Sequence, residues 1–232
     1  MDIIWEGIKQ AFILLIHGDP TVLRVVGLSL LVSGAATALS LVVGIPAGSA
    51  LGLSRFPGRR VLLALVNAGM GAPPVVVGLI VTIFFWRTGP LGVLHLIYTP
   101  TAMIVAQFVI AVPVVMGFTT ATMQNLDPKL RLQILALGAS RLQMVWLLLK
   151  EARLPLLAAV MAGFGAVISE VGASQMVGGN ITGQTSVMTT AILGEVSKGD
   201  FALAMAFSVI LMILVLLVNY VLTTVQQRGR GR

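Results

Sequence analysis

Five long apolar stretches constrain the fold of this chain more than any other feature of its sequence. They cover approximately residues 21–53, 61–86, 98–123, 154–177 and 201–226. An α-helix rises ~1.5 Å per residue, so about 20 residues cross the ~30 Å hydrocarbon core of a bilayer. Because an open chain in lipid satisfies its backbone polar groups only as a helix, the sequence predicts an all-α membrane protein with five transmembrane helices.

The composition agrees with this prediction. Hydrophobic residues make up 57% of the chain and charged residues 10%, and the mean hydropathy is +1.01, which is too apolar for a soluble domain. A chain of 232 residues has room for one domain of a few spans and for no separate catalytic module. The chain contains no cysteine, which excludes disulfides, thiolate metal sites and Cys nucleophiles.

The distribution of Lys and Arg predicts the orientation in the membrane. If the N-terminus is outside, eleven of the 15 basic residues lie on one side, and only Lys9, Arg24, Arg87 and Lys198 lie on the other. Basic residues are retained on the cytoplasmic side. We therefore expect an external N-terminus, a transmembrane domain over residues 21–227 and a basic cytoplasmic tail at 228–232.

The N-terminal segment, residues 1–20, is too short to be a typical span. Ile4, Ile8, Phe12 and Leu15 recur at helical spacing. This pattern predicts an interfacial helix that lies along the outer surface, and a short sixth span is the alternative.

Small residues and prolines mark the first two spans. Gly27, Gly34, Gly44, Gly48 and Gly52 in the first span offer surfaces for close helix approach. The second span contains "GMGAPPVVVG", in which two prolines remove backbone donors and predict a broken helix. Broken helices in membranes usually line a pathway or pack against protein. The pathway interpretation gives as candidates Met70, Gly71, Ala72, Pro73, Pro74, Val75, Val76 and Val77; the alternative is a structural kink without solute contact.

Glu170 is the only acidic residue deep in a predicted span. An ionised carboxylate there costs ~2.5–3.5 kcal/mol on insertion scales, so we expect it to face the bundle interior. It is either a gate residue or a buried hydrogen-bonding strut, and the lack of a partner base favours the strut. Further candidates for the pathway or its mouth are Ser169, Ser174, Gln175, Asn180 and Thr182.

The sequence gives little support for an enzyme. His17 and His95 lack carboxylate or Cys companions at metal-ligand spacing. No G-x-x-x-x-G-K-[ST] motif is present, so any ATP must bind another subunit.

A basic loop at residues 125–154 separates the third and fourth predicted spans. It contains two segments with helical periodicity, and Gly138-Ala139-Ser140 interrupts them. Asn125 and Asp127 are candidate caps, and Pro128 suits a first helical position. From these residues alone, the loop either docks on a partner protein or rests on anionic lipid.

This loop resembles the coupling segment of the permease subunits of ATP-binding cassette importers, in which a short helix followed by Gly docks on the ATPase subunit. The Glu-Ala-Ala common ahead of the Gly in that family is replaced here by Leu132, Gln133 and Ile134. The resemblance implies a type I importer permease fold. It assigns ATPase coupling to Leu135, Ala136, Leu137, Gly138, Ala139, Ser140 and Arg141.

Within that superfamily the chain is most similar to the tungstate permeases of the molybdate, tungstate and sulfate group. The resemblance covers "HGDPTV", "SRFPGRR", "GAPPVVVGL", "TGPLG", "YTPTAMIVAQ", "ISEVGASQMVGGNITGQT" and "TTAILGEVSKGDF". It implies alternating access by two copies of this chain, two ATPase subunits that hold ATP and Mg²⁺, and an extracytoplasmic oxyanion-binding protein. No cofactor and no nucleic acid is implied for this chain, and the expected location is the inner membrane of a prokaryote.

The resemblance leaves alternatives for the substrate and the mechanism. Molybdate or sulfate could replace tungstate, since permeases of neighbouring oxyanions share much of this pattern. The rival classes are an ion-coupled secondary transporter, a membrane-embedded enzyme and a purely structural membrane subunit. Glu170 and the Pro-Pro break give some support to the ion-coupled transporter.

Overall fold

The computed structural model describes the backbone of residues 2–230 and the side chains of residues 4–227. All regular secondary structure in this part of the chain is helical. The elements are α1 (Asp2–His17), α2 (Pro20–Leu53), α3 (Arg59–Met70), α4 (Pro74–Phe85), the 3-10 helix η1 (Gly92–Leu94), α5 (Pro100–Gln124), α6 (Pro128–Ala136), α7 (Arg141–Glu151), α8 (Arg153–Ile168), α9 (Gly172–Gly178), α10 (Met188–Lys198) and α11 (Phe201–Arg230).

Three helices, α2, α5 and α11, are each long and apolar enough to cross a membrane alone. The pair α3–α4 bends by 99° and the pair α7–α8 bends by 74°, and counting each pair as one span gives up to five. The expected break in the second span is present between Met70 and Pro74. The prediction of one helix over 154–177 is wrong, because residues 169–171 leave the helix and separate α8 from α9.

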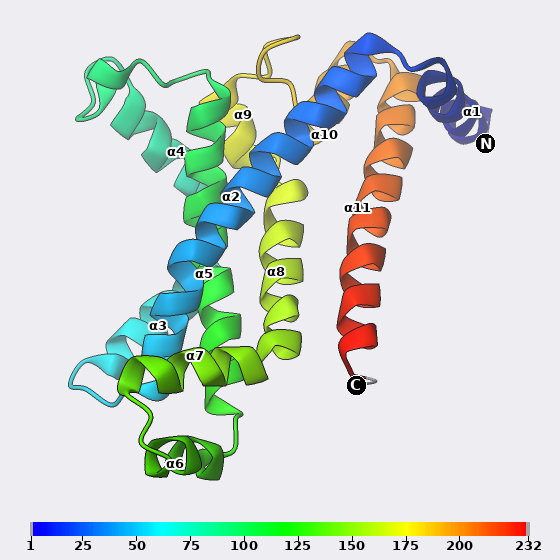
Figure 1. Cartoon of the computed structure of the whole chain (residues 1–232). Helices are drawn as coiled ribbons and strands as arrows, with labels where there is room; N and C mark the ends of the chain where they lie inside the picture. Colours follow the sequence, from blue (N-terminus) through cyan, green and yellow to red (C-terminus); the bar gives the residue numbers. More distant parts are fainter. Residues whose placement is uncertain (1, 231–232) are drawn as a thin grey trace.

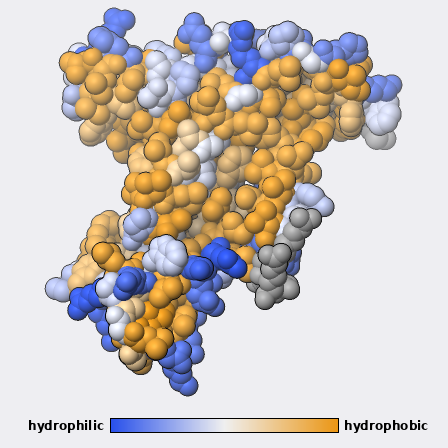
Figure 2. Space-filling model, viewed as in Figure 1, coloured by the Kyte–Doolittle hydropathy of each residue, from blue (hydrophilic) through white to orange (hydrophobic). Residues whose placement is uncertain are grey.

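The spans connect two ends of the molecule (Figure 1). The N-terminus, α1, α9 and α10 lie toward one end, and α6, α7 and the C-terminal end of α11 lie at the other (Figure 1). An apolar band separates hydrophilic residues at these ends (Figure 2). The loop at 125–154 and the end of α11 therefore share one end, as the distribution of basic residues predicts. Of the predicted tail, residues 228–230 continue α11, and residues 231–232 lie outside the described part.

Helix α1 packs against α11. A Cβ atom at Gly7 would lie 2.5 Å from Met205 Cβ and 3.2 Å from Ala202 O, so glycine allows the two helices to pack closely. The opposite side of α1 exposes apolar side chains such as Trp5 and Ile16. α1 is not among the helices that could cross a membrane, so an additional span gains no support, and the interfacial position stays a prediction.

Three glycines of α2 form its contact with α5. A Cβ at Gly44 would lie 2.7 Å from Val115 Cγ1, one at Gly48 would lie 2.7 Å from the Met116 carbonyl oxygen, and one at Gly52 would lie 2.6 Å from Met123 Cβ. The small-residue prediction is confirmed for these positions. At Gly27 and Gly34 an added Cβ would meet nothing within 4 Å in this chain, so these two positions take no part in the α2–α5 contact.

Buried apolar residues form three clusters. One joins α2, α4, α5 and α9 and contains Val32, Phe85 and Met103. A second joins α1, α2, α10 and α11. The third contains Met123 and Leu148 and connects the end of α5 to α7 and α8. The first cluster positions the two helix breaks, and the third anchors the loop at 125–154.

Candidate functional site: a coupling turn and a pair of broken helices

The predicted coupling residues form one turn between α6 and α7. Asp127 caps α6, because its Oδ1 accepts from Lys129 N at 2.8 Å, and Pro128 is the first helical residue. Both match the sequence prediction, whereas Asn125 is the C-cap of α5. α6 ends at Ala136, and α7 begins at Arg141 after only four residues.

Gly138 and Ser140 determine the geometry of this turn. Gly138 has φ +84°, a left-handed conformation that favours glycine. Ser140 begins α7 with a capping box: its Oγ accepts from Gln143 N at 3.3 Å, and Ser140 N donates to Gln143 Oε1 at 2.7 Å. The two features stop one helix and start the next in a new direction.

The turn exposes apolar side chains and is anchored on its other side. Leu137 is 88% exposed and Leu142 is 84% exposed, and a Cβ at Gly138 would meet nothing within 4 Å. On the opposite face of α7, Met144 and Leu148 are buried in the third cluster. Packed side chains therefore connect this turn to α5 and α8.

Residues 71–73 separate α3 from α4, and the two prolines lie at the end of this break. Pro74 is the first residue of α4, and Pro73 precedes it in an extended conformation. Val75 and Val76 are about half exposed. Met70 lies against α5, where a Cβ at Gly117 would clash with its sulfur. Within the predicted pathway residues 70–77, Val75 and Val76 are exposed beside the interrupted helix, whereas Val77 is partly buried against the first cluster.

Glu170 lies in the break between α8 and α9, at residues 169–171, and its hydrogen bonds stabilise this segment. Its side chain is buried, and its Oε1 accepts from Ala173 N at 2.9 Å in the first turn of α9. Its carbonyl oxygen accepts from Thr189 Oγ1 on α10 at 2.8 Å. A carboxylate at a helix N-terminus is favoured by the helix dipole. These contacts are those of a strut, the role that the sequence favours.

The two breaks lie against each other. A Cβ at Gly78 of α4 would lie 2.6 Å from Ala173 Cα of α9. A Cβ at Gly172 would lie 2.6 Å from Val75 Cγ2 and 3.5 Å from Glu170 Oε1. Two segments almost 100 residues apart in the sequence therefore form one site, with Val75 and Glu170 on its two sides.

The remaining predicted residues divide into different environments. Ser169 is exposed, and its hydroxyl donates to Gly165 O at 2.8 Å. Ser174 is fully buried and accepts from Gln107 Nε2 of α5 at 3.1 Å, so it packs inside the chain instead of facing open space. Gln175 is partly buried, and its Oε1 is buried without a partner among the described residues. Sequence reasoning missed Gln107, although an amide in an apolar span is a readable signal for a buried polar contact.

Asn180 and Thr182 lie in the loop between α9 and α10, at the end that also carries α1. Thr185 stabilises this loop, since its Oγ1 accepts from Ile181 N at 3.0 Å and donates to Gly178 O at 2.5 Å. Thr182 is exposed and lines a cavity of about 240 Å³ with Arg24. These two residues therefore lie at the end of the molecule opposite the α6–α7 turn, and their position at the mouth of a pathway stays a prediction. Arg24 is a neighbour that the sequence did not single out.

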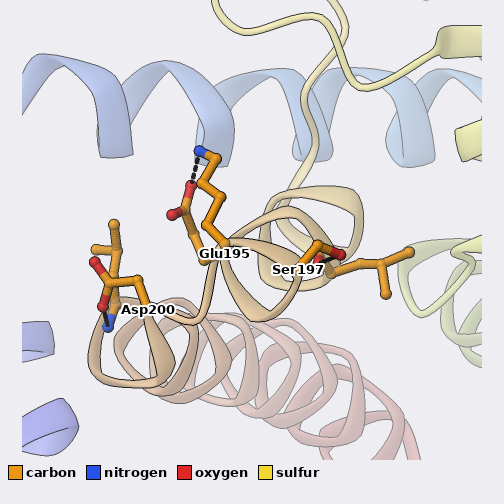
Figure 3. A network of polar contacts seen from close by, with 6 residues as sticks. Glu195, Ser197 and Asp200 are labelled. Carbon is orange, nitrogen blue, oxygen red and sulfur yellow. Dashed lines mark hydrogen bonds and ion pairs between the residues drawn. The ribbon is translucent and has the colours of Figure 1, made fainter.

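The turn from α10 into α11 holds the one ion pair among the described side chains. Lys198 Nζ lies 2.7 Å from Glu195 Oε1, and Asp200 Oδ1 accepts from Leu203 N at 3.0 Å as a cap of α11 (Figure 3). Within residues 4–227 no group of three or more His, Cys, Asp or Glu residues could hold a metal ion. This network stabilises local structure.

Comparisons with known proteins agree with this architecture. A sequence profile for "Binding-protein-dependent transport system inner membrane component" matches residues 44–231. The tungstate uptake system permease protein of Peptoclostridium acidaminophilum is 39% identical, with 98% of this chain and 100% of the relative covered. A probable anion ABC transporter permease of Haloferax volcanii is also 39% identical, with coverage of 90% and 92%.

A solved structure shares the fold. The MetNI methionine ABC transporter in inward-facing conformations matches with a TM-score of 0.76 at 23% identity, covering 89% of this chain and 95% of that chain. At this identity the similarity concerns the arrangement of the helices.

Proposed function

Because this chain belongs to the binding-protein-dependent transport system inner membrane components, the membrane-spanning permeases of ABC transporters, we propose that it forms the pathway of an ATP-driven importer for tungstate. The observation that carries the proposal is the 39% identity to a tungstate uptake permease over 98% of this chain. The anion permease at the same identity supports an oxyanion substrate.

The assembly that we propose contains two copies of this chain, two ATPase subunits and an extracytoplasmic oxyanion-binding protein. ATP and Mg²⁺ belong to the ATPase subunits, since this sequence has no P-loop motif. The apolar surface around Leu137 and Leu142 docks on the ATPase, and the end with Asn180 and Thr182 receives the binding protein. In this orientation the N-terminus is outside and the C-terminus is cytoplasmic.

Transport follows from the pair of broken helices. Movement of the ATPase subunits displaces the Gly138 turn, and packing at Met144 and Leu148 transmits the displacement to α5 and α8. The breaks at Pro73 and Glu170 are points where α4 and α9 can shift relative to the helices beside them. The exposed side chains of Val75 and Val76 are apolar and place no fixed cation at the break, so they do not hold a dianion there.

Reconstituted uptake tests the proposal. The permease is inserted into vesicles with its ATPase, and labelled tungstate, molybdate and sulfate are each presented on the binding protein. We expect tungstate uptake that requires ATP and the ATPase. Uptake that persists without ATP would instead indicate an ion-coupled transporter, absence of uptake of all three would indicate a structural subunit, and preference for molybdate or sulfate would correct the substrate.

A further inference from the structure

A large cavity lies where the C-terminal end of α2 meets α6 and α7. Its volume is about 700 Å³. Three arginines line it, Arg55 after α2, Arg131 in α6 and Arg141 at the start of α7, and no acidic residue of the described chain does. Three positive charges around one space repel each other unless an anion offsets them.

The three arginines and a serine that line the cavity have hydrogen-bonding groups without partners in the described chain. Arg131 Nη1 donates to Leu53 O at 2.7 Å, which leaves most of its five donors free. Arg55 and Arg141 form no hydrogen bond or ion pair with the side chains described at positions 4–227. Ser49 also lines the cavity; it is 1% exposed, and its buried hydroxyl has no partner in that part of the chain.

Apart from Ser54, the rest of the lining is apolar and includes Pro46, Ala50, Val145 and Leu149. A small hydrated anion would lose water against these walls without replacement. An amphipathic anion would match both parts of the cavity, with its charged group at the arginines and its hydrocarbon along the apolar walls.

The position of the cavity agrees with the level of lipid headgroups. Its lining comes from the C-terminal part of α2 and from α6 and α7, at an end of the molecule where hydrophilic residues adjoin the apolar band (Figures 1 and 2). α7 continues into α8 through a bend of 74° at this end (Figure 1). On α7, Trp146 is 62% exposed, and Lys150 Nζ lies 5.4 Å from the centre of its ring. Trp and Lys together are typical of the membrane interface.

We propose that this cavity binds one anionic phospholipid per chain. The phosphate lies between Arg55, Arg131 and Arg141 and accepts hydrogen bonds from their guanidinium groups. An acyl chain follows the wall formed by Pro46 and Leu149. Because the lipid contacts α2, α6 and α7 at once, it braces the coupling turn against the first span.

Native mass spectrometry of the purified full-length permease, with whatever subunits co-purify, tests this proposal. The protein is equilibrated with equal amounts of phosphatidylglycerol and phosphatidylcholine, and we expect one phosphatidylglycerol to be retained per chain. Each of Arg55→Gln and Arg141→Gln should weaken retention about fivefold, and the double variant roughly 30-fold. Arg60→Gln and Arg153→Gln are matched controls, since both residues are exposed and neither lines the cavity.

A second measurement requires no change in the cavity. The variant Trp5→Phe/Trp86→Phe leaves Trp146 as the sole tryptophan, and brominated phosphatidylglycerol should quench its fluorescence more than brominated phosphatidylcholine at the same mole fraction. Equal retention of the two lipids, equal quenching, or unchanged retention in the double arginine variant would overturn the proposal. Displacement of the lipid by millimolar tungstate or sulfate would also overturn it, and would assign the cavity to a small oxyanion.

Discussion

Replacing Gly138 tests whether the left-handed turn between α6 and α7 matters for ATPase docking. The residue has φ +84°, and a Cβ there would meet no atom within 4 Å. Gly138→Ala therefore creates no clash, and its whole effect comes from the backbone conformation. An L-residue in this region costs roughly 1–2 kcal/mol relative to glycine.

This strain gives a definite expected magnitude. A cost of 1–2 kcal/mol lowers the equilibrium constant for forming the native turn by about 5- to 30-fold. If the docked complex requires the native turn, the affinity for the ATPase falls by up to this factor, and by the whole factor where the turn is only marginally stable before docking. Gly138→Glu adds a carboxylate that the docked interface must desolvate, so we expect ATPase co-purification to be lost while the permease is still inserted.

The assay is equilibrium binding of the purified ATPase to the permease in nanodiscs, followed by substrate-stimulated ATP hydrolysis. Gly138→Asn is the conservative variant, because Asn tolerates the left-handed region, and it should bind better than Gly138→Ala. Gly165→Ala in α8 is the control: its site is equally open, and its backbone is helical. Unchanged ATPase affinity in both Gly138→Ala and Gly138→Glu would refute the docking role of this turn.

Three further predictions follow from individual contacts. Gly48→Ala places a Cβ 2.7 Å from Met116 O and should lower the free energy of unfolding in detergent by about 1–3 kcal/mol. The control Gly27→Ala should be neutral or slightly stabilising. Equal effects of the two variants would contradict the α2–α5 contact. Glu170→Ala removes the acceptor for Ala173 N and should lower the free energy of unfolding by about 1–2 kcal/mol. Glu170→Gln keeps an acceptor and should transport nearly as well as the wild type. Loss of transport in a stable Glu170→Gln variant would favour a gate role for Glu170. Thr185→Val removes the two hydrogen bonds that the Thr185 hydroxyl makes in the loop that carries Asn180 and Thr182, and amide exchange at residues 179–187 should rise about tenfold or more. Unchanged exchange would show that the backbone hydrogen bonds to Ile181 O hold the loop.

Local sequence patterns predicted much of this architecture. Hydropathy located the spans, because burial in lipid requires a long apolar helix wherever the chain crosses. Asp127, Pro128, Gly138 and Ser140 determine the ends of α6 and α7 through their own backbone preferences and caps. These features depend on residues within one helical turn, so the sequence is sufficient to identify them.

The candidate site depends on contacts between distant segments, and only the tertiary structure decided it. The sequence lists glycines along α2 but does not tell which of them face α5: Gly44, Gly48 and Gly52 do, and Gly27 and Gly34 do not. Sequence reasoning also missed the break at residues 169–171. There the Glu170 carboxylate accepts from Ala173 N in the first turn of α9, and the Glu170 carbonyl oxygen accepts from Thr189 Oγ1.

The same limit applies to the contact of Val75 with Gly172 and to the cavity that gathers Arg55, Arg131 and Arg141. In an apolar chain almost every face of a helix is hydrophobic, so periodicity distinguishes neither lipid-facing from protein-facing sides nor one partner helix from another. The sequence by itself determined where the chain crosses the membrane and where it turns. Packing between segments far apart in the sequence decided which residues meet.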